Sequence, residues 1–268
     1  MIDRERLENA WKTAVIVGKE EEGARLPFFE AWDVLPSTND RAATLAAAGA
    51  PDFTMVTADR QTAGKGRRGR VWETPAGSSI AMSLVLRPKV ELSALSELTI
   101  LAGIAVARCL KALGAAPKIK WPNDIRLLDR KVCGILAETK LSGCAADYVI
   151  LGIGINVTKT AYSEEVAEIA VSLEEAGITA VREDLMAGIT AEMMKLIAEW
   201  EEMGNISFII DEYESSMEWK GEICRVIAAD GSFAEGKAMG IFPDGALRFL
   251  TPEGGQHVTA GEVSLRRG

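Results

Sequence analysis

The chain has 268 residues, of which 48% are hydrophobic and 26% charged, and its formal net charge is −9. This composition is typical of a globular protein with one large core, or a large and a small domain, and it excludes disordered and fibrous classes. The negative charge argues against electrostatic binding of nucleic acid or anionic membrane over the whole surface. Four scattered cysteines without a CxxC spacing and a charged start, MIDRERLENAW, predict a cytoplasmic protein without a targeting or membrane-spanning segment.

The first part of the chain alternates between helical and strand patterns. Ser37 and Asp40 have the spacing of a capping box, which predicts a helix over residues 41–48 that ends at Gly49. Apolar residues then recur at helical spacing over residues 92–113 and stop at Gly114. Around these segments we expect a helix over 3–18 and strands over 28–35, 53–59 and 78–88.

The second part predicts a meander of strands followed by acidic helices. The strands are expected over 118–128, 131–141 and 147–157, with turns at Asp129-Arg130 and Ser142-Gly143. Acidic helices are expected to fill residues 163–217.

The last fifty or so residues have a different texture, with short alternating strands after Trp219. The pairs Asp230-Gly231 and Asp244-Gly245 and the run Glu253-Gly254-Gly255 are hairpin turns, and their close spacing predicts a small β-barrel. Strand pairs and separate helical stretches favour an α+β fold, with a main domain over 1–217 and a barrel domain over 218–268.

The segment RQTAGKGRRGR, residues 60–70, contains five cations and no acid. Its three glycines would let the backbone approach a ligand closely, and its lysine and arginines would donate charge-assisted hydrogen bonds to phosphate or carboxylate. We interpret the segment as an anion-binding loop, with a solvated basic turn as the alternative.

Other phosphate-binding motifs fit this loop poorly. Gly64, Gly66 and Gly69 match the spacing of the dinucleotide fingerprint, but a helix should follow them, and Pro75, Gly77 and then a strand follow instead. No lysine has the surroundings of a P-loop, and no aromatic residue is interleaved with the cations as in a single-strand nucleic-acid site. The single histidine, His257, stands in a turn-rich stretch and is interpreted as a surface strand residue, so the chemistry must use other side chains.

Three further constellations stand at predicted strand ends, namely KWPND at 120–124, KVCGIL at 131–136 and GIGIN at 152–156. Each of them alone is weak evidence for a functional site, because a lysine after a turn is usually solvated and a glycine in a strand usually marks a bulge or close packing. In combination, the series STND, QTAGKGRRGRVW, KWPNDI, RKVCGIL and GIGINV, followed by a small barrel, resembles biotin protein ligases from about residue 30 to residue 268.

The resemblance implies a mixed-sheet catalytic domain of the biotin/lipoate ligase type with a C-terminal SH3-like barrel. It also implies a two-step reaction, in which biotin and ATP form biotinyl-5'-AMP and a lysine of a biotin carboxyl carrier domain then receives the biotin. Joining a carboxylate to a phosphate brings two anions together. We therefore expect catalysis to come mainly from electrostatic stabilisation by protein cations and by Mg²⁺ bound to the triphosphate. Regulatory members have an additional helix-turn-helix domain, for which the roughly thirty residues before the first core strand are too few, so we expect no specific DNA binding.

The resemblance also implies roles for individual residues. Arg67 and Lys131 match the two cations that hold the reacting carboxylate and phosphate, and we take them as the catalytic residues. The implied biotin contacts are Ser37, Thr38, Asn39, Gln61, Gly64, Lys65, Gly66, Arg67, Lys131 and Gly134. The implied ATP contacts are Arg67, Arg68, Trp72, Lys120, Asn123, Asp124, Lys131 and Asn156, with Asn123 and Asp124 on the metal side.

Two positions depart from the family pattern, and two other functions stay open. Lys65 stands where arginine is more frequent and Cys133 where alanine is frequent, and the lysine lacks arginine's planar fork, which leaves retention of the adenylate in doubt.

The alternatives are a lipoate or octanoate ligase of the same architecture and a nucleotide- or nucleic-acid-binding regulator without enzymatic activity. The carrier, and whether the protein forms a homodimer, are left open by the sequence.

Overall fold

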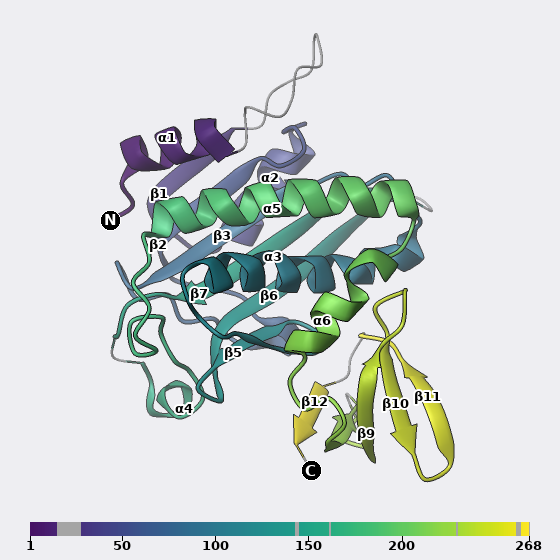
Figure 1. Ribbon diagram of the computed structural model, residues 1–268. Coiled ribbons are helices and arrows are strands. Elements are labelled where there is room, and N and C mark those ends of the chain that lie inside the picture. Colours follow the sequence, from purple (N-terminus) through teal and green to yellow (C-terminus); the bar gives the residue numbers. More distant parts are fainter. Residues whose placement is uncertain (15–27, 143–144, 161, 229, 261–263, 268) are drawn as a thin grey trace.

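The computed structural model describes residues 1–14, 28–142, 145–160, 162–228, 230–260 and 264–267. Two sheets organise these residues, a seven-stranded mixed sheet and a five-stranded antiparallel sheet near the end of the chain. Figure 1 shows the larger sheet behind α3 and α5, and the smaller sheet as a separate layer below them. The predicted α+β class is confirmed.

The larger sheet has the strand order β1-β2-β3-β7-β6-β5-β4. Only the β1–β2 pair is parallel, and α2 (Thr38–Ala47) connects these two strands. The strands from β4 to β7 form the predicted antiparallel meander. The strand bounds are β1 Phe29–Leu35, β2 Met55–Gln61, β3 Ser79–Leu86, β4 Lys118–Lys120, β5 Asp124–Leu127, β6 Arg130–Ser142 and β7 Ala145–Asn156.

Helices pack on both faces of this sheet, and the two faces differ in which helices cover them. The apolar helix α3 (Leu98–Ala112), preceded by the 3₁₀ turn η3 (Leu92–Glu97), and the long helix α5 (Arg182–Met203) pack on one face (Figure 1). On the opposite face α2 packs against Val56, Val85 and Ile150, and no other helix of the described residues packs against the strands there. The uncovered part of that face is available for a binding site.

The part of the main domain that the structure describes has three further helices: α1 (Arg4–Ala14), which packs on α5, the single turn α4 (Glu164–Ala167), and α6 (Ile210–Ser216), which follows the 3₁₀ turn η4 (Ser207–Ile209). Among the described residues one segment, Leu92–Ala112, is long and apolar enough to cross a membrane. Of the apolar stretch in this segment, 61% is buried inside the fold, as expected for a core helix.

The five strands of the smaller sheet pair in the order β11-β10-β9-β8-β12. Their bounds are β8 Ile223–Ile227, β9 Phe233–Ile241, β10 Leu247–Thr251, β11 Gly254–Val258 and β12 Ser264–Arg267. The predicted hairpin turns at Gly231, Gly245 and Gly254 all have positive φ, which glycine adopts without strain. The sheet docks through the turn before β10, where Trp121 Nε1 donates to the carbonyl of Gly245 (3.0 Å) and Ile206 N donates to that of Pro243 (3.1 Å).

Buried side chains of the smaller sheet, such as Cys224, Phe249 and Leu265, belong to the same apolar cluster as those of the main domain. The two parts therefore share one continuous core, although the chain passes from one to the other only once, between α6 and β8. The described cysteines, Cys109, Cys133 and Cys224, are free, as the sequence predicts, and Cys144 lies outside the described residues.

Several local predictions need correction. Ser37 is the N-cap of α2, but its side chain makes no capping hydrogen bond, and Asp40 pairs with Lys65, so the capping box does not form. The stretch 163–217 is only partly helical, because residues 168–181 form turns and a bridge between α4 and α5. The helix predicted over 3–18 is confirmed as far as Ala14, and residues 15–18 lie outside the described residues.

Glu97 provides a test of how the smaller sheet docks. The side chain is buried beside the docked turn, where Trp200 Nε1 donates to Glu97 Oε2 (2.7 Å) and Glu97 Cγ lies 3.5 Å from the position of a Cβ on Gly245. Burial raises the pKa of Glu97 to about 7, the Trp200 hydrogen bond opposes the rise, and nearby Asp244 adds to it. A carboxyl with a raised pKa in the folded state stabilises the fold at low pH and loses that contribution as the pH rises.

We expect Glu97→Gln to unfold with the same free energy as the parent near pH 4.5 and to be more stable above pH 7, by up to about 3 kcal/mol. Urea unfolding at pH 4.5 and pH 8 measures this difference. Glu91→Gln, which replaces an exposed carboxylate of the same cleft, is the control for the change of residue type. A constant difference between Glu97→Gln and the parent at both pH values would contradict titration of Glu97 in this range.

Candidate functional site

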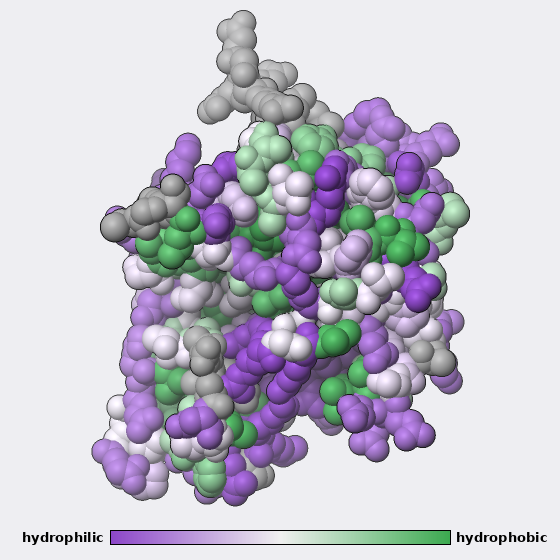
Figure 2. Space-filling model, turned by 180° about the vertical axis from the view of Figure 1, so that it is seen from behind, coloured by the Kyte–Doolittle hydropathy of each residue, from purple (hydrophilic) through white to green (hydrophobic). Residues whose placement is uncertain are grey.

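The uncovered part of the larger sheet carries two adjoining cavities on the side of α2. The first lies over β3, β6 and β7, and the second extends from it toward the smaller sheet. Figure 2 views the molecule from this side and shows hydrophilic side chains across the centre of the face. Five residues line both cavities, namely Gly66, Arg67, Trp72, Asn123 and Lys131.

The basic loop between β2 and β3 separates the two cavities. It is held at its base, where Trp72 N donates to the carbonyl of Gly64 (3.0 Å) and Gly66 N donates to that of Arg70 (2.8 Å). Residues Arg67–Gly69 form a 3₁₀ turn, and Arg68 has φ +59, a left-handed conformation that is strained for a side-chain-bearing residue. The loop is therefore an ordered structure among the described residues, which favours a binding role over a solvated turn.

Glycines on β6 and β7 form the floor of the first cavity. Successive strand residues point to opposite faces, so Gly152 and Gly154 face the cavity while Ile153 and Ile155 point into the core under α3. A Cβ on Gly154 would lie 2.4 Å from Trp72 Cε2, and one on Gly152 would lie 2.4 Å from Asn39 Oδ1. The missing side chains thus allow an indole and an amide to lie directly on the sheet.

One end of the first cavity is a buried hydrogen-bond network. Gln61 Oε1 accepts from the backbone N of Thr38 (2.8 Å) and from its Oγ1 (3.1 Å). Ser83 Oγ lies within hydrogen-bond distance of Thr38 Oγ1 (2.8 Å) and of Asn39 Oδ1 (2.5 Å), and its single proton can be donated to one of them. Ser37 is also buried here, and its Oγ has no partner among the described residues. An unpaired buried hydroxyl costs stability unless a ligand satisfies it.

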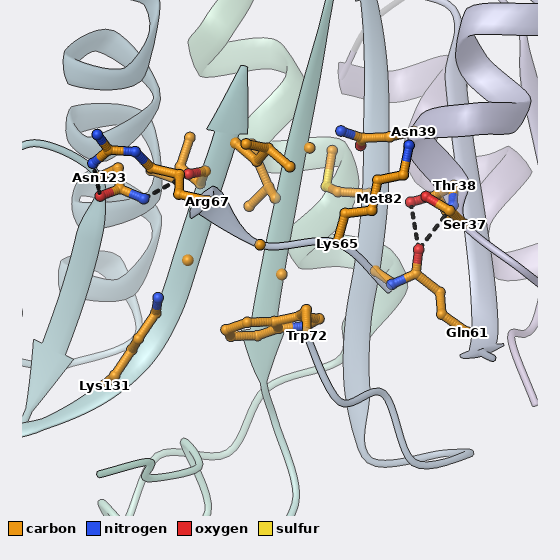
Figure 3. Close-up of a pocket in the computed structure, with 18 residues that line it drawn as sticks. Ser37, Thr38, Asn39, Gln61, Lys65, Arg67, Trp72, Met82, Asn123 and Lys131 are labelled. Carbon is orange, nitrogen blue, oxygen red and sulfur yellow. Dashed lines mark hydrogen bonds between the residues drawn. The ribbon is translucent and has the colours of Figure 1, made fainter. Parts of the chain in front are cut away.

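Cations and amides form the opposite end of the first cavity. Figure 3 shows Arg67, Asn123 and Lys131 on one side and Ser37, Thr38, Asn39 and Gln61 on the other, with Trp72 between them. Arg67 Nη1 donates to Asn123 Oδ1 (2.9 Å), and Arg67 Nη2 donates to the carbonyl of Ala260 (2.7 Å) in the segment before β12. Lys131 Nζ lies 5.3 Å from the centroid of the Trp72 ring.

Asp124 organises the charges at this cationic end. Its Oδ1 is 2.6 Å from Lys131 Nζ, and its Oδ2 is 3.8 Å from Lys120 Nζ. Burial by itself would raise the pKa of Asp124, but Lys131 and Lys120 outweigh it and hold the pKa below its usual range. Burial also lowers the pKa of Arg67, against the attraction of Asp124. The carboxylate therefore stays ionised and fixes the ammonium group of Lys131 beside the indole.

The second cavity has a polar floor and an apolar wall. Asn156 donates from Nδ2 to the carbonyl of Val171 (3.3 Å), which ties the end of β7 to the segment after α4. Trp72, Val166 and Ile169 supply apolar surface, and Tyr162 contributes a hydroxyl that is buried without a partner among the described residues. Cations from the loop, from β4 and β5, and from β12 surround the remainder of the cavity.

The structure brings nearly all of the residues singled out in the sequence to these two cavities. Of the ten predicted biotin contacts, nine line the first cavity, and the exception, Gly64, holds the loop through its carbonyl. All eight predicted ATP contacts line the second cavity. Lys65 lines the first cavity but pairs with Asp40 and lies 3.9 Å from Glu138, so its ammonium group is already partnered by acids of α2 and β6.

Sequence reasoning missed several cavity residues. Ala81 on β3 faces the cavity opposite Gly154 but looks like an ordinary strand residue in the sequence, and Met82, which also borders the cavity, belongs with its register partner Ile153 to the core under α3. Tyr162, Trp219 and Arg266 come from segments with no recognised motif. The GIGIN run carried a usable signal, because alternating glycines in a strand leave one face of a sheet bare.

Asn123 and Asp124 fit poorly as direct ligands of a metal ion. The amide oxygen of Asn123 accepts from Arg67, its nitrogen donates to the carbonyl of Ile135 (2.8 Å), and Asp124 is paired with two lysines. Among the described residues no group of three His, Cys, Asp or Glu side chains could hold a metal. Any divalent ion at this site would depend on ligands supplied by a bound substrate.

Comparisons with known proteins agree with this geometry. Residues 32–156 match the model of the Biotin/lipoate A/B protein ligase family, and residues 221–266 match the Biotin protein ligase C terminal domain. The chain is 36% identical over 239 residues to the bifunctional ligase/repressor BirA of Bacillus spizizenii, covering 87% of this chain and 72% of that protein. It is 44% identical over 124 residues to the biotin–[acetyl-CoA-carboxylase] ligase of Paracoccus denitrificans, covering 45% of this chain and 51% of that one.

Among solved structures, the biotin protein ligase of Aquifex aeolicus in complex with biotin and ATP is similar with a TM-score of 0.79 and 30% identity. The alignment covers 90% of this chain and 99% of that one, so it includes both sheets. With a relative above 30% identity covered over most of its length and both domain models matched, the chain belongs to the biotin protein ligase family.

Proposed function

We propose that the protein activates biotin with ATP and transfers it to a lysine of a biotin carboxyl carrier domain. In the first step a carboxylate oxygen of biotin attacks the α-phosphorus of ATP, and the bond to the β-phosphate oxygen breaks. Pyrophosphate leaves with the electron pair, and biotinyl-5'-AMP remains. In the second step the neutral amine of the carrier lysine attacks the acyl carbon, AMP leaves, and the nitrogen loses a proton.

The observation that carries the proposal is the shared wall of the two cavities. A two-substrate condensation needs two sites that meet at the reacting atoms, and Arg67, Lys131 and Trp72 line both cavities. Two cations at that junction can hold a carboxylate and a phosphate together and reduce the repulsion between them. No general base is needed in the first step, because a carboxylate is already ionised at neutral pH.

Biotin fits the first cavity with its ring at the hydrogen-bond network and its carboxylate at Arg67 and Lys131. The unpartnered Ser37 Oγ, with Asn39 and Gln61 beside it, suits a small polar ring that both donates and accepts. Ala81, Leu136 and the glycine floor provide the apolar contact that a hydrocarbon chain requires. A lipoate or octanoate ligase would leave this polar end unused, which favours biotin over either acid.

ATP fits the second cavity. Trp72, Val166 and Ile169 offer a flat apolar wall for adenine, and Asn156 lies at the end of β7 close to that wall. Arg67, Arg68, Lys120 and Lys131 can receive the phosphates. Magnesium would arrive with the triphosphate and neutralise part of its charge, and Asp124 is the acidic side chain nearest to that path.

The setting of the reaction follows from the same proposal. The acceptors would be carrier domains of biotin-dependent carboxylases. We expect the reaction to take place in the cytoplasm. We also expect the protein not to bind a specific DNA site. The division of the chain at residues 217 and 218 agrees with the C-terminal match, which begins at residue 221. The smaller sheet would then contribute the Ala260 carbonyl to Arg67 and part of the nucleotide cavity.

The proposed function predicts biotin-dependent exchange of labelled pyrophosphate into ATP. Purified protein should catalyse exchange with biotin and MgATP, and lipoate or octanoate at the same concentration should support little of it. Mass spectrometry of the mixture should show biotinyl-5'-AMP. Equal exchange rates with lipoate, or none with biotin, would refute the assignment.

Arg67→Ala should slow formation of the adenylate or speed its dissociation by roughly 10- to 150-fold, because one charge-assisted contact contributes about 1.5–3 kcal/mol. Single-turnover adenylation and filter binding measure both rates. Arg6→Ala is the control, since Arg6 is exposed and pairs with Asp184 away from the cavities. Unchanged rates in Arg67→Ala would mean that the loop arginine serves only the fold.

The glycine floor predicts a difference between two alanine substitutions. Gly152→Ala should raise the KM for biotin at least tenfold by displacing Asn39, with a smaller effect on the KM for ATP. Gly154→Ala should affect both substrates because it displaces Trp72, which lines both cavities. Gly255→Ala meets no atom within 4 Å and should behave as the parent. Identical effects of the two floor substitutions on the two KM values would contradict this division.

A further inference from the structure

At the rim of the second cavity, the connection between α6 and β8 carries an aromatic ring beside two cations. Lys120 Nζ and Arg126 Cζ each lie 5.5 Å from the centroid of the Trp219 ring, and all three residues line the cavity. Cations near an aromatic face are attracted by its quadrupole and lose conformational freedom. We call Trp219, Lys120 and Arg126 the Trp219 platform.

Both sheets hold the backbone of the platform in place. Glu218 N donates to the carbonyl of Ile119 on β4 (2.9 Å), and Gly221 N donates to that of Ala238 on β9 (2.7 Å). Trp219 itself has φ +61, a left-handed conformation that is unfavourable for a large side chain. Such strain persists only where surrounding contacts impose it, and it is frequent at ligand sites.

The charge around the platform is unbalanced. The cations that line the second cavity are Arg67, Arg68, Arg70, Lys120, Arg126, Lys131 and Arg266, whereas its acids are Glu73, Asp124, Asp129 and Glu168. Arg126 is 2.7 Å from Glu218, and Asp124 is shared between Lys131 and Lys120. Burial lowers the pKa of Lys120 to about 8 and Asp124 opposes this, while Arg266 and Arg126 lower it further. A multiply charged anion would relieve this repulsion.

We propose that the Trp219 platform binds the two terminal phosphates of ATP and then the pyrophosphate that leaves. This inference rests on the proposed function, which puts the α-phosphate beside Lys131. Asp124 links Lys131 to Lys120, and Trp219 links Lys120 to Arg126, so the cations continue from the reacting phosphate toward the platform. Arg126 can receive phosphate oxygens through guanidinium N–H groups other than the one paired with Glu218.

The test separates the terminal phosphates from the rest of the nucleotide. In Arg126→Gln, binding of inorganic pyrophosphate and of MgATP should weaken about tenfold or more, while binding of AMP changes less than twofold. Isothermal titration of the full chain with each of the three ligands gives these values. Transfer of biotin from preformed biotinyl-5'-AMP should also stay unchanged, because that compound lacks the terminal phosphates.

Arg225→Gln is a matched control in the smaller sheet. Arg225 pairs with Glu235 (3.0 Å), and its Cζ lies 5.1 Å from the centroid of the Phe233 ring, so it makes the same two kinds of contact as Arg126, at a more exposed position outside both cavities. Trp219→Leu removes the ring while keeping both cations, and it should weaken pyrophosphate binding by less than Arg126→Gln. If Arg126→Gln does not fold, Arg126→Lys keeps the charge beside Glu218 and should show a smaller selective loss for pyrophosphate.

Equal weakening of pyrophosphate and AMP, or no weakening of either, would overturn the inference and leave Arg126 as a partner of Glu218. Failure of the proposed function has a different signature. The parent would then show no biotin-dependent exchange, while Arg126-dependent pyrophosphate binding persisted in the titrations.

Discussion

The close approach of the Trp72 indole to the sheet is the contact on which both cavities depend. An indole can lie on a β-sheet only where the strands beneath it lack side chains, and Gly134 and Gly154 provide that space on adjacent strands. Register makes the pair effective, because Gly134 of β6 and Gly154 of β7 are direct neighbours. The ring then forms a wall of each cavity, and one aromatic side chain determines where two substrates can meet.

Around this contact, each neighbouring element contributes a different chemical group. The start of α2 and the end of β2 supply hydroxyls and amides, β5 and β6 supply Asp124 and Lys131, and the loop supplies Arg67. The helices α3 and α5 pack on the opposite face of the sheet, away from the site (Figure 1). Binding groups therefore sit on a packed scaffold, an arrangement that favours precise positioning.

Much of the fold and most of the site residues could be predicted from the sequence, because the decisive signals were local. Glycine stops, hairpin turns and strand alternation depend on neighbouring residues, and Gly49, Gly114, Gly231 and Gly245 all have the positive φ that these signals require. The capping box does not form, since Ser37 makes no capping hydrogen bond and Asp40 pairs with Lys65 from a loop distant in the sequence. Trp219 and Tyr162 were missed for a related reason, since only the folded chain brings their isolated segments to the nucleotide cavity.

The hydrogen bond from Arg67 to the carbonyl of Ala260 has a consequence for how the protein matures. The two residues are 193 positions apart in the chain, and Ala260 follows every strand of the larger sheet. A nascent chain still on the ribosome can form the main sheet and the glycine floor long before residue 260 has emerged. The arginine between the two cavities obtains this acceptor only when the last strands dock, so the site reaches its final form late, after the scaffold around it has folded.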